Sequence, residues 1–283
     1  MRRRAITVLL LGAMLVAVTG CVGQIGAGTL TPKVKPPVIS RVGVLRAAVD
    51  LSYPPFGGTV KGQKVGLDVD VAAAVAEQMG LKLELVDATP AAASALLSSR
   101  SVDVVMGGLT VDSAVGAQIA FAGTYVADAP ALFGSKGATV TPDALGTKRI
   151  AVQSESLAYW ILLDTYGEAP LMVVPSLDAA LKAVVAKKAD VAAGDALVGA
   201  YMLRGYPTLA YSGQLDSAYP LGIGVSQANT QLETQVRMVL DKLAAQGVLE
   251  TLRHKCIGDL PPFKVTAPAS ADESAALEAT STP

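Results

Sequence analysis

Apolar positions in residues 41–263 fall into short runs that alternate with longer segments of helical period. The longer segments carry apolar residues about every 3.6 positions, as in the helix that places Val71, Val75 and Met79 on one face. The short runs predict strands at 44–49, 82–86, 102–106, 149–152, 171–174, 190–193 and 221–225. This alternation is typical of α/β proteins with mostly parallel sheets covered by helices on both faces.

Polar residues and glycines mark the expected helix ends. Asp68 or Asp70 is expected to cap the first helix, and Gly80 is expected to end it. Ser176 is expected to cap the helix that follows it, and Asn229 to cap the long helix near the end of the folded region.

One short pattern occurs twice. The run VDVVMGG at 102–108 is repeated in outline as ADVAAGD at 189–195, and each copy follows an amphipathic helix that ends in basic residues. Two similar halves are the simplest explanation. We expect one lobe at 41–130 plus 222–263 and a second lobe at 131–221.

The first residues have the pattern of a secretory signal. Three arginines at 2–4 precede an apolar run at 5–18, which is shorter than the roughly 20 residues that a membrane span needs. Small residues then lead to Cys21, in a VTGC run that resembles the bacterial lipobox. We therefore expect a signal peptide at 1–20 and lipidation of Cys21; an uncleaved membrane anchor is the alternative.

The segments that flank the folded region lack periodic apolar residues. Residues 21–40 are rich in Gly, Pro and Thr and are expected to form a flexible tether, and residues 264–283 are expected to be a disordered tail. The protein would then be held at the outer face of the cytoplasmic membrane or in the periplasm.

Composition narrows the possible functions. The net charge of −1 gives no sign of the basic surface that nucleic-acid binding needs. With Cys21 lipidated, Cys256 has no partner for an intramolecular disulfide, and with His254 it supplies too few ligands for a structural zinc. We expect no metal and no cofactor.

Candidate chemistry gathers after the predicted strands, where open parallel sheets bind their ligands. Glycines there would let backbone amides approach a ligand, and hydroxyls at expected helix starts could point the same way. These strand-end clusters are Asp50, Gly107-Gly108-Leu109-Thr110, Gln153-Ser154-Glu155-Ser156 and Gly194-Asp195.

Several motifs together resemble family 3 of the bacterial extracellular solute-binding proteins, the polar amino acid receptors of ABC importers. They are DLSYPPF at 50–56, GLDVD at 66–70, the strand and turn at 103–110, FAGTY at 121–125 and Gly194-Asp195. The resemblance covers essentially residues 41–258. It implies the two-lobe fold of type II periplasmic binding proteins, hinge closure over a small polar solute, a permease partner and a monomeric receptor.

The family pattern also implies roles for individual residues. Tyr53 would pack on the ligand, and Asp50 and Asp195 would accept hydrogen bonds from its amino group. Phe56 and Asp68 would be structural. The other end of the ligand would be held by Gly107, Gly108 and Thr110, with Ser154 and Ser156 opposite.

The chain departs from the family at two positions. Val115 stands where members that bind α-amino acids usually carry the arginine that clamps the carboxylate, and Pro90 replaces a frequent tryptophan. Each hydrogen bond to a charged group contributes about 1.5–3 kcal/mol, so the lack of this arginine would weaken the binding of a carboxylate. Asp50 and Asp195 also make the cleft acidic, and buried carboxylates need a cationic partner. The ligand is therefore expected to be an amine, another cation or a polar solute without a free α-carboxylate. An arginine that reaches the site from elsewhere is the alternative.

Three other interpretations stay open. A dehydratase-like or lyase-like enzyme could use Asp50 and Asp195, although His254 lies far along the chain from the strand ends. A sensory or adhesion lipoprotein could keep the same fold without transport. Tyr159 and Trp160 could form an aromatic wall for a cation or an ordinary core pair.

Overall fold

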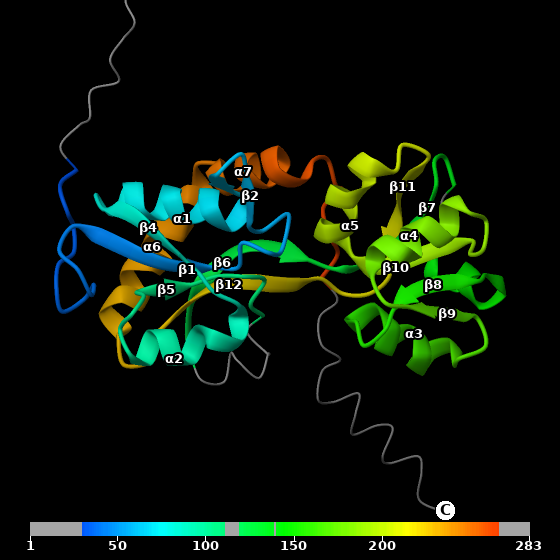
Figure 1. Ribbon diagram of the computed structural model, residues 1–283, viewed down its shortest axis with the longest axis horizontal. Helices are drawn as coiled ribbons and strands as arrows, with labels where there is room; N and C mark the ends of the chain where they lie inside the picture. Colours follow the sequence, from blue (N-terminus) through cyan, green and yellow to red (C-terminus); the bar gives the residue numbers. More distant parts are fainter. Residues whose placement is uncertain (1–29, 111–118, 139, 266–283) are drawn as a thin grey trace, which may run out of the picture. The chain divides into compact units, whose positions relative to one another are not determined.

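The computed structural model describes residues 30–110, 119–138 and 140–265. The predicted signal peptide, Cys21 and Val115 lie outside these described residues. The described residues from Thr31 onward belong to one compact unit, which holds two five-stranded sheets and the helices that cover them (Figure 1).

The first sheet has the strand order β4-β1-β5-β12-β6. Its strands are β1 (Val44–Val49), β4 (Lys82–Asp87), β5 (Val104–Val105), β6 (Ala120–Asp128) and β12 (Tyr219–Val225). β1 pairs in parallel with β4 and β5, while β12 runs antiparallel to both β5 and β6. Four strands therefore run in one direction and β12 runs against them.

The second sheet repeats this arrangement with the order β11-β7-β10-β8-β9. Its strands are β7 (Pro130–Ser135), β8 (Ile150–Gln153), β9 (Leu171–Val174), β10 (Val191–Asp195) and β11 (Leu209–Gln214). β8 pairs in parallel with β9 and β10, and β7 is the reversed strand between β10 and β11. The two sheets thus share one topology, as the repeated sequence pattern suggests.

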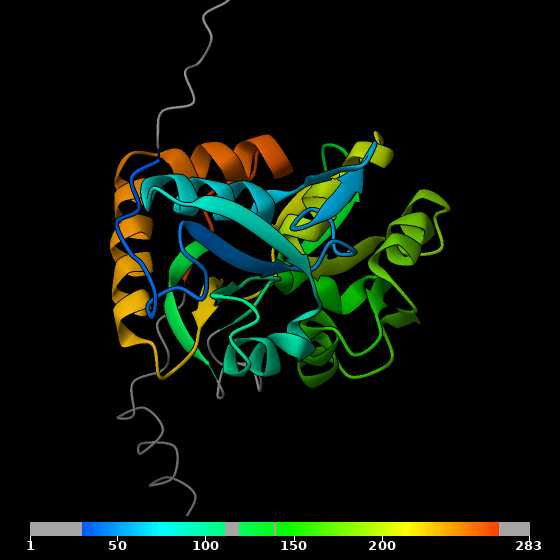
Figure 2. The ribbon, with the colours of Figure 1, turned by 60° about the vertical axis from the view of Figure 1, so that its left-hand side comes forward.

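Helices cover both faces of the first sheet. α2 (Ala93–Ser98) lies on one face, and α1 (Leu67–Gln78), α6 (Thr230–Ala245) and α7 (Val248–Ile257) pack together on the other. Figure 2 shows α7 running beside α1, with α6 at the outer end of the sheet. Helices from the first and the last part of the folded chain thereby pack on the same sheet.

The predicted cap of α1 is wrong. Gly66 is the N-cap residue and makes no side-chain capping bond, whereas Asp68 lies inside the first turn. Asp68 is fully buried and accepts a hydrogen bond from the Tyr125 hydroxyl at 2.7 Å. Burial of this carboxylate against β6 competes with capping, because its side chain cannot point inward and also fold back over the helix start. Gly80 ends the helix region with φ +69°, as predicted.

The other predicted caps are confirmed. Ser176 Oγ accepts the Ala179 amide at the start of α4 (Leu177–Val185), and Asn229 Oδ1 accepts the Leu232 amide at the start of α6. Ser156 caps α3 (Leu157–Tyr166) by accepting the amide of Tyr159. These short-range hydrogen bonds depend on local sequence alone, so they could be predicted reliably.

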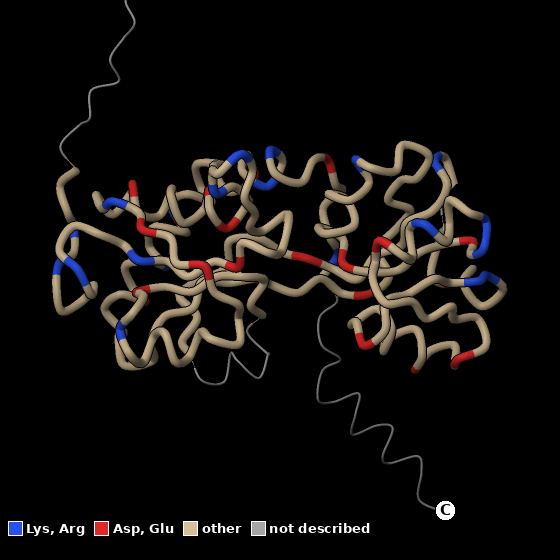
Figure 3. The backbone as a smooth tube through the Cα atoms, viewed as in Figure 1, with Lys and Arg blue, Asp and Glu red and all other residues tan. Residues whose placement is uncertain are grey.

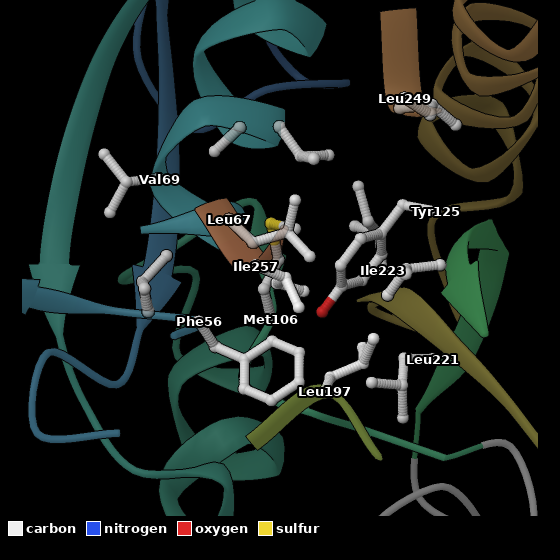
Figure 4. Packing of buried hydrophobic residues seen from close by; sticks show 14 of the residues in the cluster. Phe56, Leu67, Val69, Met106, Tyr125, Leu197, Leu221, Ile223, Leu249 and Ile257 are labelled. Atoms are coloured by element: carbon white, nitrogen blue, oxygen red, sulfur yellow. The ribbon is translucent and has the colours of Figure 1, made fainter. Parts of the chain in front are cut away.

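The second sheet carries α3 on one face, with α4 and α5 (Ala196–Met202) on the other (Figure 1). The largest cluster of buried side chains includes residues packed between sheet and helices in both halves. In Figure 4, Leu197 from α5 lies close to Phe56 and Leu221, which follow or belong to strands of the first sheet. The apolar core is therefore continuous beneath the place where the two sheets meet.

Some elements differ from the prediction. The strand predicted at 102–106 shortens to β5, and the hairpin of β2 (Gly58–Val60) and β3 (Gln63–Val65) was not predicted. β12 begins at Tyr219, so the expected lobe boundary between residues 221 and 222 falls inside a strand of the first sheet. The division into two lobes that move as bodies stays a prediction.

Candidate functional site

A cavity of about 510 Å³ opens where strand ends of the two sheets meet. It is lined by Tyr53, Phe56, Gly108, Thr110, Asp128, Leu157, Asp195, Tyr219 and Leu221. These residues come from the segments after β1 and β5, the ends of β6 and β10, the start of α3, and β12. Other cavities of about 480–550 Å³ exist in the described structure, but the lining of this one joins the carboxyl ends of β5 and β10, where such sheets bind ligands.

Four of the predicted ligand-binding residues line this cavity: Tyr53, Gly108, Thr110 and Asp195. Tyr53 is 38% exposed and stacks on the buried ring of Phe56, with 5.4 Å between ring centroids and 20° between planes. Phe56 thus supports Tyr53 from below, in agreement with its expected structural role.

Asp50 does not line the cavity. Its Oδ1 accepts hydrogen bonds from the amide of Ser52 at 2.8 Å and from the Ser52 hydroxyl at 2.6 Å. This Asx turn draws the carboxylate into its own loop. Asp50 stays near the site through its Cβ, which lies 3.9 Å from the position that a Cβ on Gly107 would take.

Gly107 lies beneath the cavity floor. It is buried with φ +128°, and a Cβ there would come within 3.3 Å of Pro90 Cγ. Pro90 therefore packs directly against this turn. Gly107 contributes the conformation that brings Gly108 to the surface of the cavity.

The two predicted serines of the second half are also absent from the lining. Ser154 is exposed, and its amide donates to the carbonyl of Val174 at 2.9 Å. Ser156 Oγ is engaged in the α3 cap and also donates to the Gln153 carbonyl at 2.8 Å. In this segment the residue that reaches the cavity is Leu157.

Asp128 is the charged lining residue that the sequence motifs did not indicate, and Leu157, Tyr219 and Leu221 were not predicted for the site either. It ends β6, is 2% exposed, and its Oδ1 accepts the amides of Ala129 at 2.8 Å and Leu197 at 3.0 Å. Burial, and next the negative charge of Asp195, raise the pKa of Asp128 to about 7, although the amide bonds oppose the shift. One signal for Asp128 was present, because it is an acid in the apolar run FAGTYVADAPALF.

Asp195 ends β10, opposite Asp128. Its Oδ1 accepts a hydrogen bond from the Tyr219 hydroxyl at 3.2 Å. Burial raises the pKa of Asp195, and the bond from Tyr219 acts in the other direction. Although Asp195 is the N-cap residue of α5, it makes no side-chain cap, because Asp128 caps the Leu197 amide instead. The Asp195 side chain is thereby free to face the cavity.

The electrostatic character of the site is acidic. Its lining holds two carboxyl groups and two tyrosines, and it contains no Lys, Arg or His among the described residues. Burial and the nearby carboxylates raise the pKa of both Tyr53 and Tyr219, so these hydroxyls keep their protons. Figure 3 shows acidic positions along the connecting strands between the two sheets, where few Lys or Arg positions lie.

A second buried pair supports the floor of the site. Asp68 and Tyr125 are both at most 4% exposed and hydrogen bond at 2.7 Å. Burial raises the pKa of Asp68 to about 7. Hydrogen bonding to the backbone of Gly107 lowers the pKa of Asp68, and hydrogen bonding to the backbone of Gly108 lowers the pKa of Tyr125. The pair therefore lies against the glycine turn.

The remaining sequence candidates lie elsewhere. Cys256 is a half-buried thiol on α7 that forms no disulfide, and His254 Nε2 lies 2.7 Å from Asp259 Oδ1 at the surface. The rings of Tyr159 and Trp160 pack edge to face, with 4.9 Å between their centroids. Trp160 is 54% exposed, so the two rings are not an ordinary core pair, and neither residue lines the cavity. In the described part of the chain, no helix is long and apolar enough to cross a membrane.

Residues 45–259 match the family model described as bacterial extracellular solute-binding proteins, family 3. A curated relative, the putative ABC transporter arginine-binding protein 2 of Escherichia coli K12, is 28% identical over 75% of this chain and 89% of its own length. The virulence sensor protein BvgS of Bordetella bronchiseptica is 30% identical over 68% of this chain, which spans only 16% of that relative.

Solved structures show the same fold. An ancestral cationic amino acid solute-binding protein has a TM-score of 0.68 at 24% identity, over 76% of this chain and 96% of its own. The L-cystine solute receptor of Neisseria gonorrhoeae, in an unliganded open conformation, also has a TM-score of 0.68, at 22% identity over 77% and 94%. The fold is thus that of type II periplasmic binding proteins, as predicted. With the family model matched over most of its folded region, the chain belongs to family 3 of the bacterial extracellular solute-binding proteins.

Proposed function

We propose that this protein is the extracytoplasmic receptor of an ABC importer and that it captures a small, positively charged, amino-acid-like solute. The single observation that carries the charge preference is the cavity itself, whose described lining contains two carboxyl groups and no cationic side chain. Buried carboxylates are costly unless a cation or a proton compensates them. A solute with an ammonium or guanidinium group supplies that compensation.

The proposal assigns roles to the residues that line the cavity. Asp195 accepts hydrogen bonds from the positive group of the solute, and Tyr53 packs on it. Gly108 and Thr110 offer backbone groups from the turn after β5, which Gly107 shapes. Asp50, Ser154 and Ser156 reach the solute only if a ligand rearranges their loops. Closure of the two halves over the solute would then complete its desolvation.

Similarity to the Escherichia coli arginine-binding relative supports this class of solute. Val115, at the position of the usual carboxylate clamp, lies outside the described residues, so weak recognition of an α-carboxylate stays part of the proposal. We accordingly expect a solute that owes its affinity to its cationic group.

Tethering at the membrane is part of the same proposal. Extracytoplasmic location follows from the family. The arginines at 2–4, the apolar run at 5–18 and the VTGC sequence ending at Cys21 support export, lipidation and anchoring. A monomeric, non-catalytic receptor that presents its solute to permease subunits is the form we propose.

A sensory role is the second candidate, and the match to BvgS favours it. A histidine kinase sensor domain with a TM-score of 0.58 also shares the fold. In such a role the same cavity would bind a signal molecule. Import of a labelled solute by cells with and without this protein distinguishes the two roles, because only a transport receptor changes uptake.

Thermal denaturation with a small solute panel tests the binding proposal. The panel is L-arginine, agmatine, L-citrulline and L-glutamate. Agmatine lacks the carboxylate, citrulline has a neutral urea in place of the guanidinium, and glutamate has an anionic side chain. Arginine and agmatine are expected to raise the melting temperature, citrulline to raise it less, and glutamate to leave it unchanged. A larger shift with glutamate than with arginine, or no shift with any of the four, would contradict the proposal.

A further inference from the structure

We propose that Asp128 is a specificity-determining residue of this site, whose carboxylate acts with that of Asp195 to select a positively charged group over its neutral isostere. This inference rests on the proposed function and deepens it. It assigns ligand discrimination to a residue that no sequence motif indicated.

The position of Asp128 is fixed by the fold. As the last residue of β6 it leaves the first sheet, and two residues later Pro130 begins β7 of the second sheet. The amides of Ala129 and Leu197 both donate to Oδ1, which anchors the carboxylate at the start of α5. Asp128 also lines the cavity, so its carboxylate borders the space that a solute would occupy.

Asp195 is held next to Asp128 by backbone contacts. The amide of Ala196 donates to the carbonyl of Ala129 at 2.8 Å, so the residues that follow the two acids are hydrogen bonded to each other. Asp195 also pairs with Pro130 in the β10–β7 ladder. Two acidic side chains therefore border one cavity from two sheets, in a fixed relation.

Among the described residues, the surroundings of Asp128 supply no countercharge. The charge of Asp195 raises the pKa of Asp128, and the charge of Asp128 raises the pKa of Tyr53, Tyr125 and Tyr219. None of these four neighbours is a cation. The backbone amides of Ala129, Ala196 and Leu197 lower the cost of the buried charge without neutralising it. The pKa of Asp128 accordingly rises to about 7, so a proton provides compensation in the empty site at mildly acidic pH.

A cationic solute would replace that proton. Below pH 7 the carboxyl of Asp128 must lose its proton before it can accept the cation, and above pH 7 it is already ionised. The dissociation constant for a cationic solute is therefore expected to fall as pH rises from about 5 to about 8. A solute such as citrulline, which presents a neutral urea group in place of the guanidinium, has no such requirement where that group meets Asp128.

Asp128→Asn separates this role from the structural one, because the asparagine Oδ1 can still accept both amides. Titration calorimetry at pH 8 measures arginine and citrulline binding to the full-length purified protein. The variant is expected to lose about tenfold to a hundredfold in arginine affinity, with little change for citrulline, and to keep its melting temperature within a few degrees. Asp190→Asn, at the opposite end of β10 from Asp195, is the matched control and is expected to bind arginine as the native protein does.

Wild-type protein provides an independent measurement. Arginine binding at pH 6.5, measured in buffers of different ionisation enthalpy, is expected to release up to one proton for each solute bound. If Asp128→Asn folds and keeps the native preference for arginine over citrulline, the inference is wrong. If the variant does not fold, the absence of proton release from the wild type overturns the inference instead.

The two proposals fail in different ways. Binding of arginine by the wild type together with an unchanged Asp128→Asn variant removes only the role of Asp128. Failure of the wild type to bind any cationic solute removes the proposed function itself.

Discussion

The two copies of the strand-and-turn pattern, at β5 and β10, are alike where they begin and different where they end. At the beginning, the Asp103 amide donates to the Arg46 carbonyl at 2.8 Å, and the Asp190 amide donates to the Arg149 carbonyl at the same distance. The side chains bind the same arginines, because the Asp103 carboxylate accepts a hydrogen bond from the Arg46 amide at 2.9 Å. The Asp190 carboxylate accepts one from the Arg149 amide at 2.8 Å.

At their ends the copies supply different chemistry. β5 leads to Gly107-Gly108, where backbone in the left-handed region meets the cavity, whereas β10 ends in Gly194-Asp195, where a carboxyl group meets it. The shared beginning fixes each central strand against its neighbour, and the divergent end makes the site. An internal repeat can thus preserve a fold while its two halves divide the work of binding.

The largest effect on stability is expected at the start of the two copies, because Asp103 and Asp190 differ in burial. Asp103 is 6% exposed and accepts two backbone amides, from Ser40 and Arg46, whereas the Asp190 side chain is 44% exposed. Asp103→Ala is expected to lower the free energy of unfolding by about 2–4 kcal/mol, since it leaves buried donors unpaired. Asp190→Ala should lower it by no more than about 1 kcal/mol. Urea denaturation measures both, and equal losses would contradict the comparison.

Asp195→Ala tests the end of β10. The loss of a charged hydrogen-bond acceptor is expected to weaken binding of a cationic solute by about 1.5–3 kcal/mol, or roughly tenfold to more than a hundredfold. The fold should persist, because Asp128 and not Asp195 caps the Leu197 amide. Calorimetry gives the affinity and circular dichroism the melting curve. Native affinity in this variant would exclude Asp195 from the site.

Alanine at Gly107 and alanine at Gly194 are expected to destabilise the protein for different reasons. At Gly107, φ is +128°, so Gly107→Ala should destabilise the protein by about 1–3 kcal/mol through backbone strain. At Gly194 the new Cβ would lie 2.6 Å from Leu177 Cδ1, so the cost of Gly194→Ala comes from overpacking. A double-mutant cycle with Leu177→Ala should show favourable coupling only for Gly194→Ala. Similar coupling with Gly107→Ala would argue against strain at that turn.

The last expected effect concerns pH. Asp68 and Asp128 both have a pKa raised to about 7 in the folded protein, above the ordinary value of 3.8. The folded state therefore binds more protons than the unfolded state between about pH 4 and pH 7, and stability falls as pH rises through this range. The melting temperature of the solute-free protein is expected to drop from pH 5 to pH 8. Asp68→Asn should flatten this slope, and a rising melting temperature would contradict the assignment.

Local sequence was a good guide wherever the contacts are local. Ser176 and Asn229 cap their helices as predicted, because the acceptor and the amide lie three residues apart. The self-contained turn at Asp50 is local as well, and the Asp-x-Ser pattern could have indicated that Ser52 engages the carboxylate. Asp68 was assigned wrongly because its partner, Tyr125, is 57 residues away.

By itself, the sequence determined the alternation of strands and helices, the repeated halves, the family, and four residues of the cavity lining. These features follow from periodicity and from motifs within a few residues of each other. Only the tertiary structure decided which carboxylates face the solute. Asp128 and Asp195, which are 67 positions apart in the chain, are brought together by the crossing from β6 to β7 and the pairing of β7 with β10. Such proximity depends on chain topology and burial, which no local pattern encodes.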